Sequence, residues 1–202
     1  MPKIVDHDKQ RRIVAEAALR VIRKSGLEHA TVRRIAEEAG LSVGSMRHYF
    51  STQEDLFSFC MGLFVERVEE RLENLKWEGP LVNDLKCMLL QFLPMDQERT
   101  LEMEVWFSFS AKTLIYPELK KLSNNMQDGM HKASQFVLDK LVANKLIKPG
   151  LDIDLETEKL YALIDGLAIH GILQRDRLMP DRIESIVEQH LRTLYFDVNQ
   201  NM

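Results

Sequence analysis

The sequence predicts an all-α fold of about nine helices. Apolar residues recur at i, i+3 and i+4 along most of the chain, which is the spacing of helices buried on one face. Gly and Pro interrupt these segments where helices should end, as at Gly79-Pro80 and Pro149-Gly150. The sequence contains no β-hairpin turn between alternating residues, no internal repeat and no low-complexity tract.

The first three helices form a compact set. The first is expected from about Asp8 to Ser25, because its apolar residues make one stripe and Gly26 follows. The second begins at Thr31, whose hydroxyl is a good N-cap, and ends at Gly40, which closes a helix easily with positive φ.

A third helix begins at Ser42, a second N-cap. We expect Leu41 to be buried in the turn before it, and Val43, Met46 and Phe50 to point inward. Two short helices joined by a Gly-containing turn are the signature of a helix-turn-helix. The second helix of such a pair lies in the major groove of DNA.

The fourth helix is long. Thr52 is its predicted N-cap, Asp55 occupies the capping-box position, and its apolar stripe continues to about Leu75. Since no flexible linker precedes it, we expect a stiff connection between a DNA-binding domain over residues 1–51 and a helical effector-binding and dimerisation domain over residues 52–202. Five further helices are predicted at about 81–93, 98–115, 119–147, 154–174 and 181–196.

Charge is distributed unevenly along the chain. The 202 residues carry a formal net charge of −4, but residues 1–50 hold ten Lys and Arg against six Asp and Glu, and the remainder is net −8. A small basic module joined to a larger acidic one fits nucleic-acid binding by the first part. Basic side chains near the N-terminus are further candidates for phosphate contact, namely Lys3, Lys9, Arg11 and Arg12. The alternative for these four is an ordinary solvated terminus.

Other functional classes find no support in the sequence. No run of about 18 apolar residues and no apolar signal core occur, so we expect a cytoplasmic protein without a membrane partner. The six histidines are scattered, and no metal, nucleophile or phosphate-loop motif is present. Cys60 and Cys87 fit buried thiols. We therefore predict no enzyme activity, no metal and no cofactor.

The residue pattern of the helix-turn-helix segment is specific enough to compare with known families. The pattern T-x-x-x-I-A-x-x-A-G-x-S-x-G-x-x-x-x-Y-F, followed by x-x-x-E-x-L, runs from Thr31 to Leu56. It closely resembles the TetR family of bacterial transcriptional regulators. That resemblance implies phosphate contacts at Thr31, Tyr49 and the start of the fourth helix, and base contacts from Ser42 to His48. The predicted DNA-binding residues are Thr31, Arg33, Ser42, Val43, Gly44, Ser45, Arg47, His48, Tyr49 and Gln53.

Three positions depart from the common family pattern. Val43 stands where Lys is frequent and can pack on a thymine methyl group, whereas Arg47 stands where Tyr is frequent and can read guanine. Gln53 replaces a frequent phosphate-binding Lys, which should weaken nonspecific attraction to DNA. The alternative for Arg47 is an ordinary solvated surface arginine.

The second part of the chain carries a weaker resemblance. Leu-Ile-Asp-Gly-Leu at 163–167 and the aromatic segment Trp106-Phe-Ser-Phe109 resemble the choline-responsive betaine-pathway repressors within TetR. We expect a small cationic or apolar effector near the aromatic segment, because aromatic faces beside carboxylates suit cations. The alternative is that these aromatics are plain core. The predicted pocket residues are Glu102, Trp106, Phe109 and Met130.

The last two helices are predicted to form a two-fold dimer, which requires a palindromic operator. The segment 160–173 is apolar almost all round, and Gly166 and Gly171 within it suggest close approach of another helix. The predicted interface residues are Leu163, Ile164, Gly166, Leu167, Gly171, Ile183, Val187, Leu191 and Leu194.

Two functions therefore stay open. The first is a homodimeric repressor that binds double-stranded operator DNA and is released by a small-molecule effector. The second is an all-α structural or interaction module with constitutive or no DNA binding.

Overall fold

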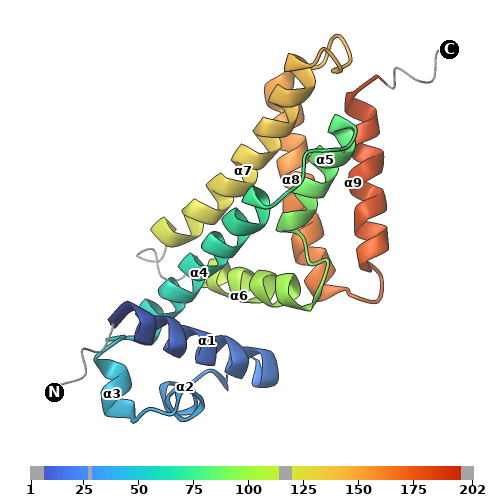
Figure 1. Ribbon diagram of the computed structural model, residues 1–202. Helices are drawn as coiled ribbons and strands as arrows, with labels where there is room; N and C mark the ends of the chain where they lie inside the picture. Colours follow the sequence, from blue (N-terminus) through green and yellow to red (C-terminus); the bar gives the residue numbers. More distant parts are fainter. Residues whose placement is uncertain (1–6, 27–28, 114–119, 197–202) are drawn as a thin grey trace. The chain divides into compact units, whose positions relative to one another are not determined.

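Figure 1 shows a computed structural model of the chain, which describes residues 7–26, 29–113 and 120–196. Within these ranges the regular structure is helical, and the only β-type pairing is an isolated bridge between Ile147 and Tyr195. The predicted all-α class is therefore confirmed. The chain packs as two compact units, unit 1 over residues 1–66 and unit 2 over residues 67–202.

Unit 1 contains three helices and the first part of a fourth. These helices are α1 (His7–Ser25), α2 (Val32–Ala39), α3 (Val43–Arg47) and α4 (Gln53–Glu73). The predicted apolar stripe of α1 is buried except for Ile13, which is 39 % exposed, and it packs mainly against α2, where Ile35 and Ala36 are buried. Burial of these apolar side chains is the main source of stability for so small a unit.

The predicted caps of the helix-turn-helix are confirmed. The backbone N–H of Arg34 donates to the Thr31 hydroxyl (3.4 Å), and that of Ser45 donates to the Ser42 hydroxyl (3.0 Å). Gly40 ends α2 with a φ of 68°, and its N–H bonds to the carbonyl of Glu37 (3.2 Å). These bonds satisfy backbone groups that the ends of such short helices leave without intrahelical partners.

Two inward positions were predicted wrongly. Leu41 is only half-buried, and Val43 is 38 % exposed, whereas Met46 and Phe50 are buried as expected. The reason is the length of α3. A helix of five residues presents little more than one position to the interior, and Met46 occupies it. Val43, at the first position of the helix, is left facing solvent.

The N-terminal part of α4 belongs to unit 1. The Thr52 hydroxyl accepts the Asp55 N–H (3.0 Å) as predicted, while the Asp55 carboxylate accepts from Ser51 (3.3 Å). Leu56 and Cys60 of this helix are fully buried, and the Cys60 thiol contacts the Ala15 carbonyl (3.9 Å). Because these turns of α4 pack on α1, the boundary between the compact units falls at 66/67, later than the predicted 51/52.

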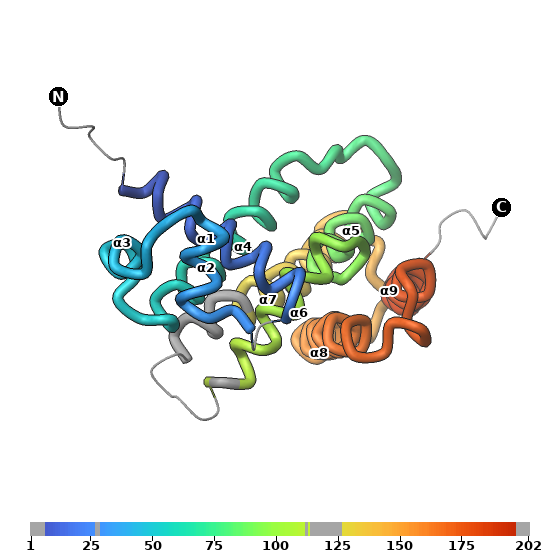
Figure 2. Tube along the Cα trace, turned by 90° about the horizontal axis from the view of Figure 1, so that it is seen from below, coloured from blue at the N-terminus to red at the C-terminus, as the bar shows by residue number. Residues whose placement is uncertain are grey.

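Unit 2 contains the rest of α4 and five further α-helices among the residues described. They are α5 (Leu81–Leu89), which runs into the 3-10 turn η2 (Leu90–Phe92), α6 (Gln97–Thr113), α7 (Lys120–Ala143), α8 (Ile153–Leu173) and α9 (Pro180–Leu194). Helix α8 packs against α6, α7 and α9, and α5 packs on α9 (Figures 1 and 2).

Helix α7 ends earlier than predicted, at Ala143 instead of about Ile147. Lys145 adopts a φ of 56°, and the N–H of Leu146 returns to the carbonyl of Leu141 (2.9 Å). The segment after α7 is then hydrogen-bonded to the end of α9, because the Lys148 N–H donates to the Leu194 carbonyl (2.9 Å). This contact supplies a partner that the last turn of α9 would otherwise lack.

The two glycines of α8 differ. A Cβ at Gly171 would lie 2.6 Å from Cγ of Pro94 and 3.1 Å from Cδ1 of Ile183, so this position confirms the predicted close approach. A Cβ at Gly166 would meet nothing within 4 Å in the described part of the chain. The close contact inside the protomer is therefore made at Gly171 only.

No helix in the described ranges is both long and apolar enough to cross a membrane. The same residues contain no group of three or more His, Cys, Asp or Glu side chains arranged to hold a metal ion.

Candidate nucleic-acid interface

Helix α3 presents most of its side chains to solvent. Ser42, Val43, Gly44, Arg47 and His48 are exposed, and Ser45 is half-buried. Met46 alone points into unit 1 and anchors the helix. The predicted base-reading residues therefore lie on one short, accessible helix, as insertion into a major groove requires.

The hydroxyls at the start of α3 leave a donor for a ligand. Ser42 Oγ lies 2.9 Å from Ser45 Oγ, and it also accepts the Ser45 N–H. The pair uses one of its two hydroxyl hydrogens internally. The other remains to donate to a phosphate or a base, beside a helix N-terminus that itself favours anions.

The two arginines predicted to contact DNA are not equivalent. Among the residues described, Arg47 has no ion-pair partner, so its guanidinium is available for the O6 and N7 atoms of guanine. The Arg33 Nε lies 3.2 Å from a carboxylate oxygen of Glu37, one turn along α2. Arg33 is highly exposed, and this pairing reduces the positive charge that it offers to a phosphate.

Gln53 has a positioning role that the sequence did not reveal. Its amide nitrogen donates to the Ala30 carbonyl (3.0 Å), which ties the start of α4 to the residue before Thr31.

Tyr49 is half-buried, with its ring centroid 5.2 Å from that of His7. Tyr49 thus stands between α3 and α4 with its ring supported by α1.

Arg11 is a supporting residue that sequence reasoning assigned to phosphate contact. Its guanidinium lies over the rings of Phe50 (4.8 Å) and Phe59 (4.6 Å) and 3.6 Å from a carboxylate oxygen of Asp55. Arg12 pairs with Glu66 (2.7 Å). Both side chains therefore hold α1 on α4, while Lys3 lies outside the described residues. Nothing in the sequence around Arg11 and Arg12 indicated that their partners would be Asp55 and Glu66, which lie far along the chain.

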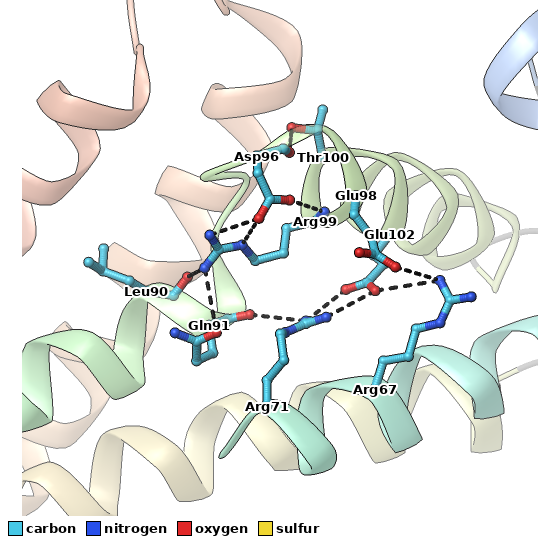
Figure 3. Close-up of polar contacts among 9 residues, drawn as sticks. All are labelled: Arg67, Arg71, Leu90, Gln91, Asp96, Glu98, Arg99, Thr100 and Glu102. Carbon is cyan, nitrogen blue, oxygen red and sulfur yellow. Dashed lines mark hydrogen bonds and ion pairs between the residues drawn. The ribbon is translucent and has the colours of Figure 1, made fainter. Parts of the chain in front are cut away.

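The predicted effector residues all lie inside unit 2. Glu102, Trp106, Phe109 and Met130 are buried, with Glu102 0 % and Trp106 3 % exposed. Glu102 receives two hydrogen bonds from Arg71, at 3.1 and 2.8 Å, so its charge is compensated within the protein (Figure 3). Glu104 is paired with Arg175. The sequence suggested that Glu102 and Glu104 add negative charge beside the aromatic segment, and in the structure an arginine compensates the charge of each.

The indole N–H of Trp106 is a hydrogen-bond donor without an acceptor among the described residues. Its indole Nε1 is buried and has no hydrogen-bond partner among the described residues. A buried donor without an acceptor costs about 1–3 kcal/mol, so the position favours an acceptor that the protein itself does not supply.

Most of the predicted dimer residues are buried within the protomer itself. Seven are buried within unit 2: Ile164, Leu167, Gly171, Ile183, Val187, Leu191 and Leu194. The sequence pattern predicted apolar faces at these positions, and packing within the protomer covers these seven residues. Leu163 and Gly166 are half-buried, and Leu173 is 62 % exposed. These three positions are not fully covered by the described residues of the protomer.

Comparison with known proteins decides the family. Residues 14–58 match the model for bacterial regulatory proteins of the tetR family, and residues 83–195 match the model for the C-terminal domain of BetI-type transcriptional repressors. The chain belongs to the TetR family. The regulator PksA of Bacillus subtilis is 41 % identical over 196 residues, covering 96 % of this chain and 94 % of that protein. The regulator BetI of Serratia proteamaculans is 27 % identical, with 86 % of each chain covered.

Solved structures of transcriptional regulators share the fold. A transcriptional regulator from Rhodococcus sp. Rha1 superposes with a TM-score of 0.77 at 26 % identity, covering 91 % of this chain and 95 % of that one. A regulator from Saccharomonospora viridis, solved in complex with choline, gives a TM-score of 0.80 at 20 % identity, covering 94 % and 99 %. As a TetR-family member, this chain is a DNA-binding transcriptional regulator with a BetI-type C-terminal domain.

Proposed function

We propose that this TetR-family chain is a dimeric repressor that binds a palindromic operator through α2 and α3 and is released by a small-molecule effector held in unit 2. The observation that supports the proposal is the exposure of the side chains on α3. Its N-terminal side chains are exposed, its start is capped by Ser42, and Arg47 is not engaged by any acid in the described ranges. No observation favours the alternative of a module without DNA binding.

Operator binding is tested directly by a gel shift. Purified protein is mixed with a fragment of DNA from upstream of its own gene at moderate salt, with an unrelated fragment of equal length as control. We expect a shift of the first fragment at concentrations that leave the second free, because specific binding exceeds nonspecific binding by roughly 10³-fold or more. Equal affinity for both fragments would contradict a sequence-specific regulator.

The proposed dimer face is a stripe on α8. Leu163, Gly166, His170 and Leu173 recur at intervals of three and four residues, so they share one helix face, and all four are half-buried or exposed. Open space beside Gly166 lets a second helix approach closely. Packing of this stripe on its copy removes the exposed leucines from water and gives the two-fold symmetry that a palindrome requires.

Gly166→Leu is expected to split the dimer while each protomer keeps its fold. A Cβ at this position meets nothing within 4 Å among the described residues, and the larger leucine side chain would occupy the space that the partner helix needs. Sedimentation at micromolar concentration measures the mass, and circular dichroism measures the helix content. Gly129→Leu is the matched control, since it also lies on a helix with open space beside it. A Gly166→Leu protein that remains dimeric would show that another face is used.

The proposed effector site surrounds Trp106. The match to a BetI-type C-terminal domain and the choline complex of the Saccharomonospora viridis neighbour support a small ligand in this unit. The free indole N–H of Trp106 favours a ligand with a hydrogen-bond acceptor beside an apolar or cationic part. Calorimetry with choline, betaine, tetramethylammonium and hydrophobic cations tests this. Ligands with an acceptor should bind more tightly than tetramethylammonium, and binding of none would remove the Trp106 site.

A further inference from the structure

Helix α3 is anchored in unit 1 at few points. It has five residues, of which Met46 alone is buried, and the chain leaves it through Tyr49 to Phe50, which is buried as well. The N–H groups of Tyr49 (2.9 Å) and Phe50 (3.1 Å) both donate to the Met46 carbonyl, so Phe50 is joined to the last turn of α3. Met46 and Phe50 are therefore two buried anchors for α3, and two anchors fix an orientation that one would leave free to turn.

The ring of Phe50 is covered by Arg11 of α1. The guanidinium carbon of Arg11 lies 4.8 Å from the centroid of the Phe50 ring and 4.6 Å from that of Phe59 on α4. The two rings meet edge to face, with their centroids 5.5 Å apart. A guanidinium is attracted to such ring faces because they carry partial negative charge. Arg11 thus gathers α1, the end of α3 and α4 around one group.

Asp55 extends this contact to the backbone that follows α3. One of its carboxylate oxygens lies 3.6 Å from an Arg11 nitrogen. The other accepts the N–H of Ser51, the residue after Phe50 (3.3 Å). The side chain of Phe50 and the backbone of Ser51 are therefore both held by groups outside α3. We call Arg11, Phe50, Asp55 and Phe59 the Arg11 cluster.

The Arg11 cluster is not arranged for the greatest stability. The Nε atom of Arg11 is buried and has no hydrogen-bond partner among the described residues. A buried donor without an acceptor lowers stability, and an apolar side chain of similar size would avoid the cost of burying a charge. The Arg11 side chain is 28 % exposed, and a phosphate could bind its guanidinium fully only by drawing it away from the two rings and Asp55. Neither stability nor phosphate binding accounts well for an arginine here.

We propose that Arg11 is a positioning residue for DNA recognition: through Phe50 and Ser51 it fixes the orientation of α3, and it does not itself contact DNA. The proposal rests on the operator binding proposed above. Hydrogen bonds to base edges depend on distance and angle, so an α3 that turns about Met46 loses specific contacts. Attraction to phosphates depends mainly on charge and changes little. Arg11 therefore acts on the difference in affinity between the operator and other DNA.

The test compares Arg11→Ala, Arg11→Lys and Arg12→Ala in the full chain. Arg12 is the matched control, because it is the next residue of α1 and also pairs with a carboxylate of α4, that of Glu66 (2.7 Å), outside the Arg11 cluster. Affinities for the upstream fragment and for the unrelated fragment are measured at several salt concentrations. Hydrogen exchange of the free protein is measured below the unfolding transition.

For Arg11→Ala we expect affinity for the upstream fragment to fall at least about fivefold relative to Arg12→Ala, the lower end for loss of one good base contact. The two variants lose the same charge, so they should bind the unrelated fragment within about twofold of each other and with the same salt dependence. In Arg11→Ala, exchange should rise at residues 46–51 and stay unchanged at residues 14–22 of α1, because only the end of α3 is released.

Arg11→Lys should also lose affinity for the upstream fragment, though less than Arg11→Ala. The ammonium group is a point charge that cannot lie flat on two rings while it reaches Asp55. Full affinity in Arg11→Lys would overturn the proposal. So would an Arg11→Ala protein that binds both fragments more weakly with a salt slope reduced by about one, which indicates a lost phosphate contact. Exchange that rises across α1 as well as at 46–51 would show a general structural role and overturn it too.

If Arg11→Ala does not fold, Arg11→Met replaces it, because methionine keeps apolar cover over the rings and loses the link to Asp55. It should show the same loss of preference for the upstream fragment by a smaller factor. An unchanged preference in whichever of these two variants is folded would overturn the positioning role. If the original protein does not distinguish the two fragments, the proposed function fails separately, and exchange at residues 46–51 alone decides whether Arg11 holds the end of α3.

Discussion

Replacing Arg47 with alanine is expected to weaken operator binding by about 1–3 kcal/mol, or roughly 5- to 150-fold, and to relax the preference at one base pair in each half-site. The guanidinium is exposed at the end of α3 and has no ion-pair partner in the described ranges. It loses little by leaving solvent for a guanine, which offers two acceptors in the geometry of its own donors. The stability of the protein should be unchanged, since Arg47 is exposed and forms no ion pair within the described ranges.

Tyr49→Phe is the control for base reading. It keeps the ring that contacts His7 and removes only the hydroxyl. A phosphate contact carries no base information, so its loss should weaken all sequences about equally. Affinities of both variants are measured on the operator and on single-base variants of it at one salt concentration. If Arg47→Ala keeps the original affinity and base preference, Arg47 does not face the base edges.

Gly171→Ala is expected to destabilise the protein by about 1–3 kcal/mol, although alanine is the better helix former. The added Cβ would lie 2.6 Å from Cγ of Pro94, an atom of a rigid ring that cannot rotate away. It would also lie 3.1 Å from Ile183 of α9. Accommodation therefore requires α8 to move away from the segment before α6 or from α9, and both contacts lie in the core of unit 2.

Gly129→Ala provides the opposite expectation in the same unit. Its Cβ would meet nothing within 4 Å among the described residues, so the higher helix propensity of alanine should stabilise α7 by up to about 1 kcal/mol. Denaturant unfolding of both variants at one protein concentration measures the two changes. A Gly171→Ala protein as stable as the original would mean that α8 can shift without loss of packing.

Local chemistry made the helix-turn-helix predictable. Thr31, Gly40 and Ser42 each act on backbone groups within a few residues, so the order of residue types alone indicates where α2 and α3 begin and end. Exposure was less predictable even here. Val43 has an apolar side chain and faces solvent, because α3 is too short to bury more than Met46.

The candidate effector site shows the opposite case. The sequence pattern placed Glu102 one turn before Trp106 and suggested that its charge could attract a cation, but Arg71, on a different helix, already pairs with that carboxylate. The partner of a buried charge is chosen by helix packing over long sequence separation, which no local pattern records. The unpaired indole N–H of Trp106 was equally invisible, since a missing acceptor is a property of the surroundings.

The sequence by itself determined the helical class, the capped helix-turn-helix and the apolar faces of α8 and α9, because periodicity and capping depend on neighbours along the chain. Only the tertiary structure decided what covers those faces. Ile164, Leu167, Val187 and Leu191 pack within the protomer, whereas Leu163 is half-buried and Leu173 is exposed on the stripe that we propose for the dimer. Likewise only the structure distinguished Gly171, which lies against Pro94, from Gly166, which lies beside open space. The physical reason is that burial is nondirectional: an apolar side chain gains about the same free energy against any apolar surface, so the fold of the whole unit selects the surface.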